Sequence, residues 1–126
     1  MDELPGALNP SDGVHAILGN KKYNVVFVKE LPDGALGWCD RPSKKGKRIQ
    51  VKAEQKPFDL LDSVLHEAIH AIAYHYSEHH VAKTATQLSQ LLWQLGYRRD
   101  PSIVFKVHEA DLSDEPPSEP CEKTHE

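Results

Sequence analysis

Short apolar runs with a period of two occupy the first half of the chain and predict β-strands. The strongest run is residues 23–28, where β-branched and aromatic side chains favour an extended backbone. Residues 36–39 are a shorter candidate, and residues 49–52 alternate between apolar and polar side chains. The intervening segments contain the proline, glycine and serine that favour turns. Since consecutive strands commonly pair, we expect a three-stranded antiparallel meander.

The period changes to that of a helix after residue 56, and two amphipathic helices are predicted. The first is expected over residues 57–76, with Pro57 at its start and Asp59 where the helix dipole favours an acid. Its apolar residues recur at helical spacing and are Phe58, Leu61, Leu65, Ile69 and Ile72. The second helix is expected over residues 79–95 and ends before Gly96. Its apolar face consists of Val81, Ala85, Leu88, Leu92 and Leu95.

The length of 126 residues suits one folded domain. Residues 1–20 show no sustained period and are expected to be a loosely ordered lead-in, with a short helical turn near residues 14–18. The domain is expected over residues 21–107, with a last short strand at residues 103–107. Residues 108–126 are acidic and proline-rich, which predicts a disordered tail. The expected class is α+β, a meander followed by two packed helices.

Composition narrows the classes of function. The net charge is −4, but residues 109–126 contain seven acids and one lysine, so the rest of the chain is slightly basic. Cys39 and Cys121 form no CxxC pair, so neither a disulfide framework nor a cysteine zinc knuckle is expected. No secretory signal or membrane-spanning stretch is present in the sequence, so a cytoplasmic protein is expected. The basic cluster at residues 44–48 is interpreted as a solvated turn, and nucleic-acid binding is not expected.

The clearest chemical signal is His66-Glu67-Ala68-Ile69-His70 in the first helix. Histidines four residues apart lie about 40° apart around a helix, so both imidazoles project from one face and can share a metal ion. Glu67 is rotated by about 100° from His66, which suits a general base better than an equal third ligand. The apolar row of the helix lies beside the histidines and places them at the rim of the core. We therefore expect one catalytic Zn²⁺ bound by His66 and His70, whereas a solvated histidine-rich helix would not need this register.

A catalytic zinc usually has three protein ligands, and the third is expected where the second helix begins, at Glu78-His79-His80. Relative to the apolar face of that helix, Glu78 and His80 each lie about 80° to one side, whereas His79 points nearly opposite. Geometry therefore favours Glu78 or His80. His79 remains a third candidate because the ends of helices fray.

The order of strands, a helix with the sequence VLHEAIHA at residues 64–71, and a second amphipathic helix resembles the minimal zincin fold. It is similar to the SprT-like and ImmA/IrrE-like metallopeptidases of bacteria and bacteriophages, over about residues 23–96. In those families the third ligand, His or Glu, opens the second helix about four residues before a core position. Counting back from Thr84, the resemblance favours His80, followed by Glu78 and His79. The chain lacks the zinc ribbon or helix-turn-helix module of some members, so neither DNA association nor repressor cleavage is implied.

The predicted function is that of a zinc-dependent peptidase acting on a peptide or protein substrate. Glu67 would take a proton from the metal-bound water and deliver it to the leaving amine. Tyr74 is a candidate for stabilising the oxyanion, although packing at the helix end is the commoner role of such a tyrosine. Residues 49–52 are considered as an edge strand for an extended substrate.

Two alternatives to a peptidase remain open at this stage. One is a zinc-stabilised protein-binding module without useful turnover. The other is an accessory factor associated with DNA or a regulator, which rests on the basic turn and on family analogy. The sequence does not specify the substrate or the oligomeric state.

Overall fold

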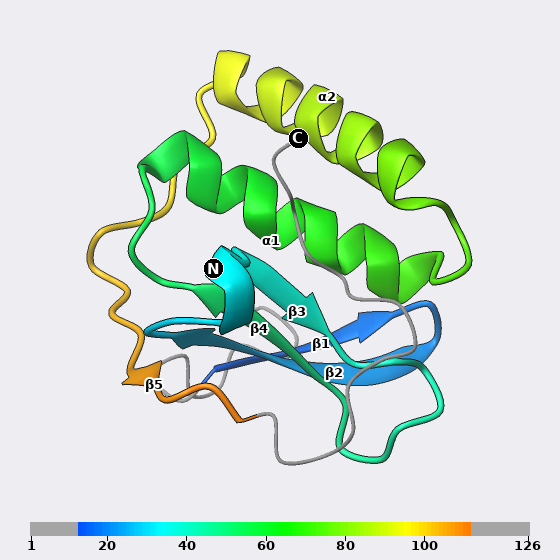
Figure 1. The fold of residues 1–126 in the computed structure, drawn as a ribbon. Coiled ribbons are helices and arrows are strands. Elements are labelled where there is room, and N and C mark those ends of the chain that lie inside the picture. The colour runs from blue at the N-terminus through cyan, green and yellow to red at the C-terminus, as the bar shows by residue number, and fades with distance from the viewer. Residues whose placement is uncertain (1–12, 112–126) are drawn as a thin grey trace, which may run out of the picture.

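The computed structural model describes residues 13–111, which form a β-sheet with two helices stacked on one of its faces (Figure 1). In chain order the elements are β1 (Val14–Leu18), β2 (Lys21–Val28), the 3-10 turn η2 (Pro32–Gly34), β3 (Gly37–Cys39), β4 (Arg48–Lys52), α1 (Pro57–Ile72), α2 (Glu78–Gln94) and β5 (Val107–His108). Helix α1 lies directly on the sheet and α2 lies on the far side of α1 (Figure 1). The predicted α+β class is confirmed.

The first strand, β1, occupies a segment for which the sequence predicted a helical turn. It pairs antiparallel with β2 through a two-residue turn at Gly19 and Asn20, whose φ angles are 59° and 65°. Two successive residues in the left-handed region define a tight hairpin turn, and glycine and asparagine adopt this conformation most readily. The helical turn near residues 14–18 was therefore wrong, because the Gly-Asn pair specifies a hairpin.

The sheet is mixed, and this corrects the expected antiparallel meander. Its strand order is β1-β2-β4-β3, with β2 and β4 parallel and the other neighbours in this order antiparallel. The chain leaves β2, forms β3 at the outer edge, and returns to place β4 between them. Ile49, Gln50 and Val51 of β4 are each at most 1% exposed. Because both faces of this central strand are covered, the polar residue Gln50 is buried and does not face solvent.

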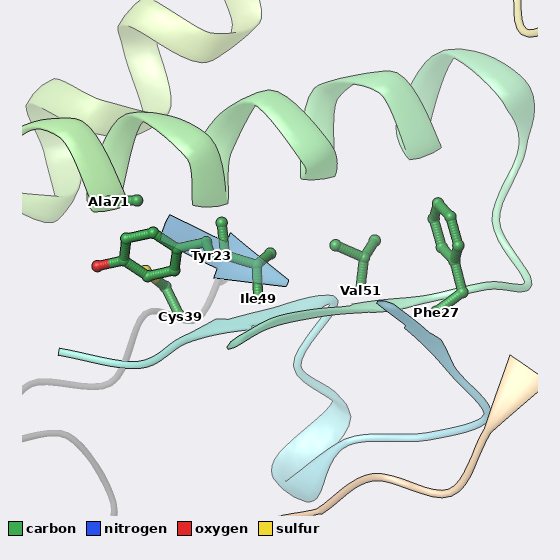
Figure 2. Packing of buried hydrophobic residues seen from close by; sticks show 6 residues of the cluster. All are labelled: Tyr23, Phe27, Cys39, Ile49, Val51 and Ala71. Carbon is green, nitrogen blue, oxygen red and sulfur yellow. The ribbon is translucent and has the colours of Figure 1, made fainter. Parts of the chain in front are cut away.

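Side chains on the two faces of the sheet form two apolar clusters. Beneath α1, five residues from β2, β3 and β4 pack with one residue of the helix, as Figure 2 shows for Tyr23, Phe27, Cys39, Ile49, Val51 and Ala71. On the opposite face, Val26, Val28, Leu31 and Ala35 pack with Trp38 and Ala110. The alternation along β2 distributes its residues between these clusters. The sheet is therefore packed on both faces, and α1 lies on one of them.

A short turn joins the two helices and sets where α2 begins. Helix α1 ends at Ile72, four residues earlier than predicted, and Ala73–Tyr76 form a turn closed by the Tyr76 N–H and the Ala73 carbonyl at 2.9 Å. The Ser77 hydroxyl then accepts a hydrogen bond from the His80 amide at 3.1 Å and caps α2. The turn therefore places the first residue of α2 beside the last turn of α1.

The most buried residues of α1 are not its apolar row. They are Asp62, Ser63, His66, Glu67, His70 and Ala71. Ile72 is 57% exposed, and on α2 Leu88 and Leu95 are 42% and 64% exposed. Helix α1 is covered by the sheet on one side and by α2 on the other. Polar residues that face either neighbour are therefore buried as well. The helix thus encloses five polar side chains, while Ile72 of its apolar row lies at the surface.

The chain after α2 returns to the sheet. Strand β5 adds parallel to the end of β2, so the strand predicted at residues 103–107 is shorter than expected and shifted. Asp111 then binds the far face of the sheet, since its amide donates to Gln50 Oε1 at 2.8 Å and its carboxylate accepts from Arg48 at 2.6 Å. The rest of the predicted tail and residues 1–12 lie outside the described residues. Neither helix within residues 13–111 is long and apolar enough to cross a membrane.

Candidate metal centre

His66 and His70 lie one turn apart on α1 and share one side of the helix. Their ring centroids are 4.9 Å apart, and both side chains are buried, with exposures of 0% and 5%. The arrangement follows from the spacing of four residues, which stacks side chains on one helical face. The histidines are more deeply buried than the rim position expected from the sequence.

Glu78, the first residue of α2, brings its carboxylate to both rings. Its Oε2 lies 3.0 Å from His66 Nε2, and its Oε1 lies 2.9 Å from His70 Nε2. One potential ligand atom from each of the three residues lies within 4.8 Å of the others. Helix α1 thus supplies two nitrogen donors, and the capped start of α2 supplies an oxygen donor. The His66/His70/Glu78 group can hold a metal ion.

The surroundings of His66 suit a metal ligand. Both of its ring nitrogens are buried, and neither has a hydrogen bond to any described residue. The approach of Glu78 to Nε2 is close, but its geometry is not that of a hydrogen bond. Buried polar groups are nearly always hydrogen-bonded, and leaving one without a partner costs about 1–3 kcal/mol. A metal ion at Nε2 would satisfy this nitrogen and draw the two other donors to the same point.

The ionisation of Glu78 suits a metal ligand. Burial of this carboxyl acts to raise its pKa, but its interactions with His66 and His70 outweigh that effect and hold the pKa below its ordinary value of 4.5. Glu78 is therefore a carboxylate at neutral pH. It is also the most accessible member of the group, with a side chain 38% exposed, so solvent reaches the group from the start of α2.

Glu67 follows His66 but points towards the sheet, at the edge strand β3. Its side chain is fully buried, and its carboxylate lies directly over Gly37. A Cβ atom at position 37 would lie 2.6 Å from Glu67 Cγ and 2.8 Å from Cδ, closer than real Cβ atoms approach other heavy atoms. The residue at position 37 therefore has to be glycine for Glu67 to keep this position. Gly37 was not anticipated, because no local pattern in the sequence reveals an approach between a strand and a helix.

The remaining residues proposed from the sequence lie outside this group. His80 is exposed, and its ring packs edge-on against Tyr76 with centroids 5.0 Å apart. His79 is also exposed. Tyr74 is partly buried against the cluster beneath α1, and its hydroxyl is enclosed. Of the three candidates for a third ligand, the structure thus brings Glu78 to the histidines.

Comparisons with known proteins give no relative from which a function could be transferred. No protein-family model matches the chain, and neither curated proteins nor solved structures provide a match. The geometry of the site is therefore the basis for any functional proposal.

Proposed function

We propose that this protein is a zinc-dependent peptidase whose ion is held by His66, His70 and Glu78. The observation that supports it most directly is the convergence of these three donors, together with the buried His66 nitrogens that lack hydrogen bonds. The order of elements and the HEAIH sequence, which resemble minimal zincins, support the same proposal.

The donor set favours zinc over the common hard cations. Two imidazole nitrogens and one carboxylate oxygen form a ligand set that catalytic zinc uses, with a fourth position left for water or substrate. Magnesium and calcium prefer sites made of oxygen ligands alone. The ionised Glu78 also reduces the charge of the bound cation, which favours binding in an enclosed site.

In the proposed reaction, Glu67 is the proton carrier. When bound, Zn²⁺ would acidify a coordinated water and polarise the carbonyl of the substrate. Glu67 follows a ligand on the same helix, and its carboxylate is enclosed between α1 and β3. It would accept the proton of the attacking water and pass it to the departing amine. Gly37 has the supporting role of leaving space for this carboxylate.

Strand β3 offers an edge for an extended substrate. The sequence suggested residues 49–52 for this purpose, but β4 lies inside the sheet and has no open edge. On either side of β3, the Asp40 amide donates to the Arg48 carbonyl and the Lys52 amide donates to the Leu36 carbonyl. By the alternation of an antiparallel pair, the backbone groups of Gly37 and Cys39 therefore face away from β4. No strand within residues 13–111 pairs with that outer side. A peptide added there would run alongside the part of β3 that contacts Glu67.

The main alternative is a zinc-stabilised binding module without turnover. One observation favours it, because His66 and Glu67 are completely buried, as ligands of structural ions commonly are. The two functions differ in whether Glu67 is needed for a chemical step or only for packing.

The test is the Glu67→Gln variant, compared with the wild type for zinc content and for hydrolysis of a peptide library. We expect the variant to bind zinc and to lose hydrolysis, whereas His66→Ala should lose both. Glu54→Gln and His75→Ala, at exposed positions outside the group, are the matched controls. Full hydrolysis by Glu67→Gln would exclude Glu67 as general base. Zinc binding without hydrolysis by the wild type would favour the binding module.

A further inference from the structure

Positive charge gathers at one end of the sheet. Because β2 and β4 are parallel, both begin at this end, where the Asn24 amide bonds the Lys47 carbonyl at 3.0 Å. We call residues 19–22 and 41–48 the basic end, since they contain seven lysines and arginines and no acid. At the opposite end, residues 29–33 and 53–59 contain two lysines and four acids. The sheet is thus electrically asymmetric along its strands.

Three of these seven basic side chains have no partner within residues 13–111. Asp40, the residue before the second basic segment, contacts Lys44 and Arg48 at 3.8 Å each, and Asp111 contacts Arg48 at 2.6 Å. Lys21, Lys22 and Lys45 are exposed and form no ion pair or hydrogen bond with another described residue. Isolated surface lysines are usually only solvated. A group with this excess of one sign, however, produces a field that attracts anions.

The basic end lies beside the candidate metal centre. A Cβ atom on Gly19 would be 3.0 Å from the Ala71 carbonyl, so the β1–β2 turn touches the end of α1 next to His70. Lys21 shares a sheet face with Tyr23, which packs beneath α1. Cys39, the last residue of edge strand β3, also lies at this end, because it pairs with Ile49 near the start of β4. One end of a peptide on β3 would therefore enter the field of these lysines.

We propose that the basic end selects substrates with acidic side chains on one side of the bond to be cleaved. This inference rests on the proposed peptidase function. Hydrogen bonds along β3 hold any backbone, so they do not choose a side chain, whereas the neighbouring lysines favour carboxylates. Single-stranded nucleic acid is the less suitable ligand, since the basic end contains no aromatic residue on which bases could stack.

The experiment measures binding without depending on turnover. The zinc-loaded, full-length Glu67→Gln protein is titrated into two fluorescent peptides of equal length, which differ only in a run of glutamates or glutamines beside a common central sequence. Lys21→Gln/Lys45→Gln removes two unpaired charges of the basic end. Lys56→Gln/Lys106→Gln removes two exposed charges elsewhere and is the matched control. A labelled DNA duplex and a labelled single-stranded RNA are titrated in parallel.

The acidic peptide should bind about 3- to 30-fold more tightly than the neutral one, and high salt should reduce the difference. Lys21→Gln/Lys45→Gln should reduce the preference to within about twofold, while the control keeps it. Equal binding of the two peptides, or an equal loss in the control, would overturn the proposal. Tighter binding of nucleic acid that is lost in Lys21→Gln/Lys45→Gln would also overturn it. Absence of hydrolysis by the wild type would reject the peptidase function separately.

Discussion

Replacing Gly37 by alanine tests whether the strand edge positions the proposed general base. The new methyl group would lie 2.6 Å from Glu67 Cγ, whereas ordinary contacts of a Cβ atom begin at 3.4 Å. Glu67 or β3 therefore has to move by about 0.8 Å, and the three atoms nearest to the added methyl group all belong to Glu67. Overpacking of this kind usually costs about 1–3 kcal/mol.

The expected outcome is a separation of metal binding from catalysis. A displacement of about 1 Å in a reacting group can reduce a rate by about 100-fold, so peptide hydrolysis by Gly37→Ala should fall by up to that factor. Zinc content should be unchanged. For a domain of this size, each kcal/mol lost lowers the midpoint of thermal unfolding by about 4–8 °C. The assay combines metal analysis, kcat/KM and a thermal melt of the same preparation.

Two comparisons make this prediction specific. Gly34→Ala places a methyl group where no atom lies within 4 Å, so it should preserve activity despite the positive φ at that position. In a Glu67→Ala background, the clashing atoms are absent, and Gly37→Ala should then cost no more than about 0.5 kcal/mol. Equal destabilisation in both backgrounds, or an unchanged rate in the single variant, would refute the assigned contact.

Two further predictions concern the ligands. Loss of a residue that only orients a zinc ligand typically reduces zinc affinity about 10- to 100-fold. Loss of the direct ligand in Glu78→Ala should therefore weaken zinc binding by at least about 100-fold. His80→Ala, outside the group, should change zinc affinity by less than about threefold. Competition with a chromophoric chelator measures both, and the reverse order would assign the third ligand to His80. Zinc at about 100 times its Kd should stabilise the fold by about 2.7 kcal/mol and so raise its melting temperature. A chelator should reverse this rise, and His66→Ala should not show it. A melting temperature insensitive to zinc would argue against this site.

Local periodicity predicted the elements that contain the site. The strands now seen as β2, β3 and β4 and the starts of both helices lie within about two residues of their expected positions. These elements have strong local signals, such as Pro57 at the start of α1 and Gly96 after α2. The missed strand β1 also had a signal, because Gly19 and Asn20 are a hairpin pair.

The order of strands depended on contacts that sequence periodicity does not contain. Gln50 in β4 suggests a solvent-facing position, yet it is 1% exposed. Its amide exchanges two hydrogen bonds with the backbone of Asp111, from a segment 61 residues away. This distant partner satisfies the buried amide and allows β4 to be a central strand. Contacts of this kind, between residues far apart in the sequence, determine which strands are neighbours in the sheet. They cannot be predicted from local hydrophobic periodicity.

The choice among third ligands depended on where the buried face of α2 lies. Leu88 and Leu95 made that face seem broad, but both are exposed, and the buried residues are Val81, Ala85 and Ser89. At about 100° per residue, Glu78 lies about 20° from the centre of this narrower face and His80 about 140° away. A small polar residue, Ser89, thus marks the contact with α1 better than two leucines do.

The buried polar side of α1 connects the stability of the fold to its proposed chemistry. Enclosing His66 without a hydrogen bond is unfavourable, and an ion would offset this cost. Glu78 is the only member of the three-residue group with a substantially exposed side chain, so solvent reaches the group where α2 begins. The short turn before α2 fixes that entrance, because it sets Glu78 against both rings. The segment that completes the three-residue group is therefore also the one at which solvent reaches it.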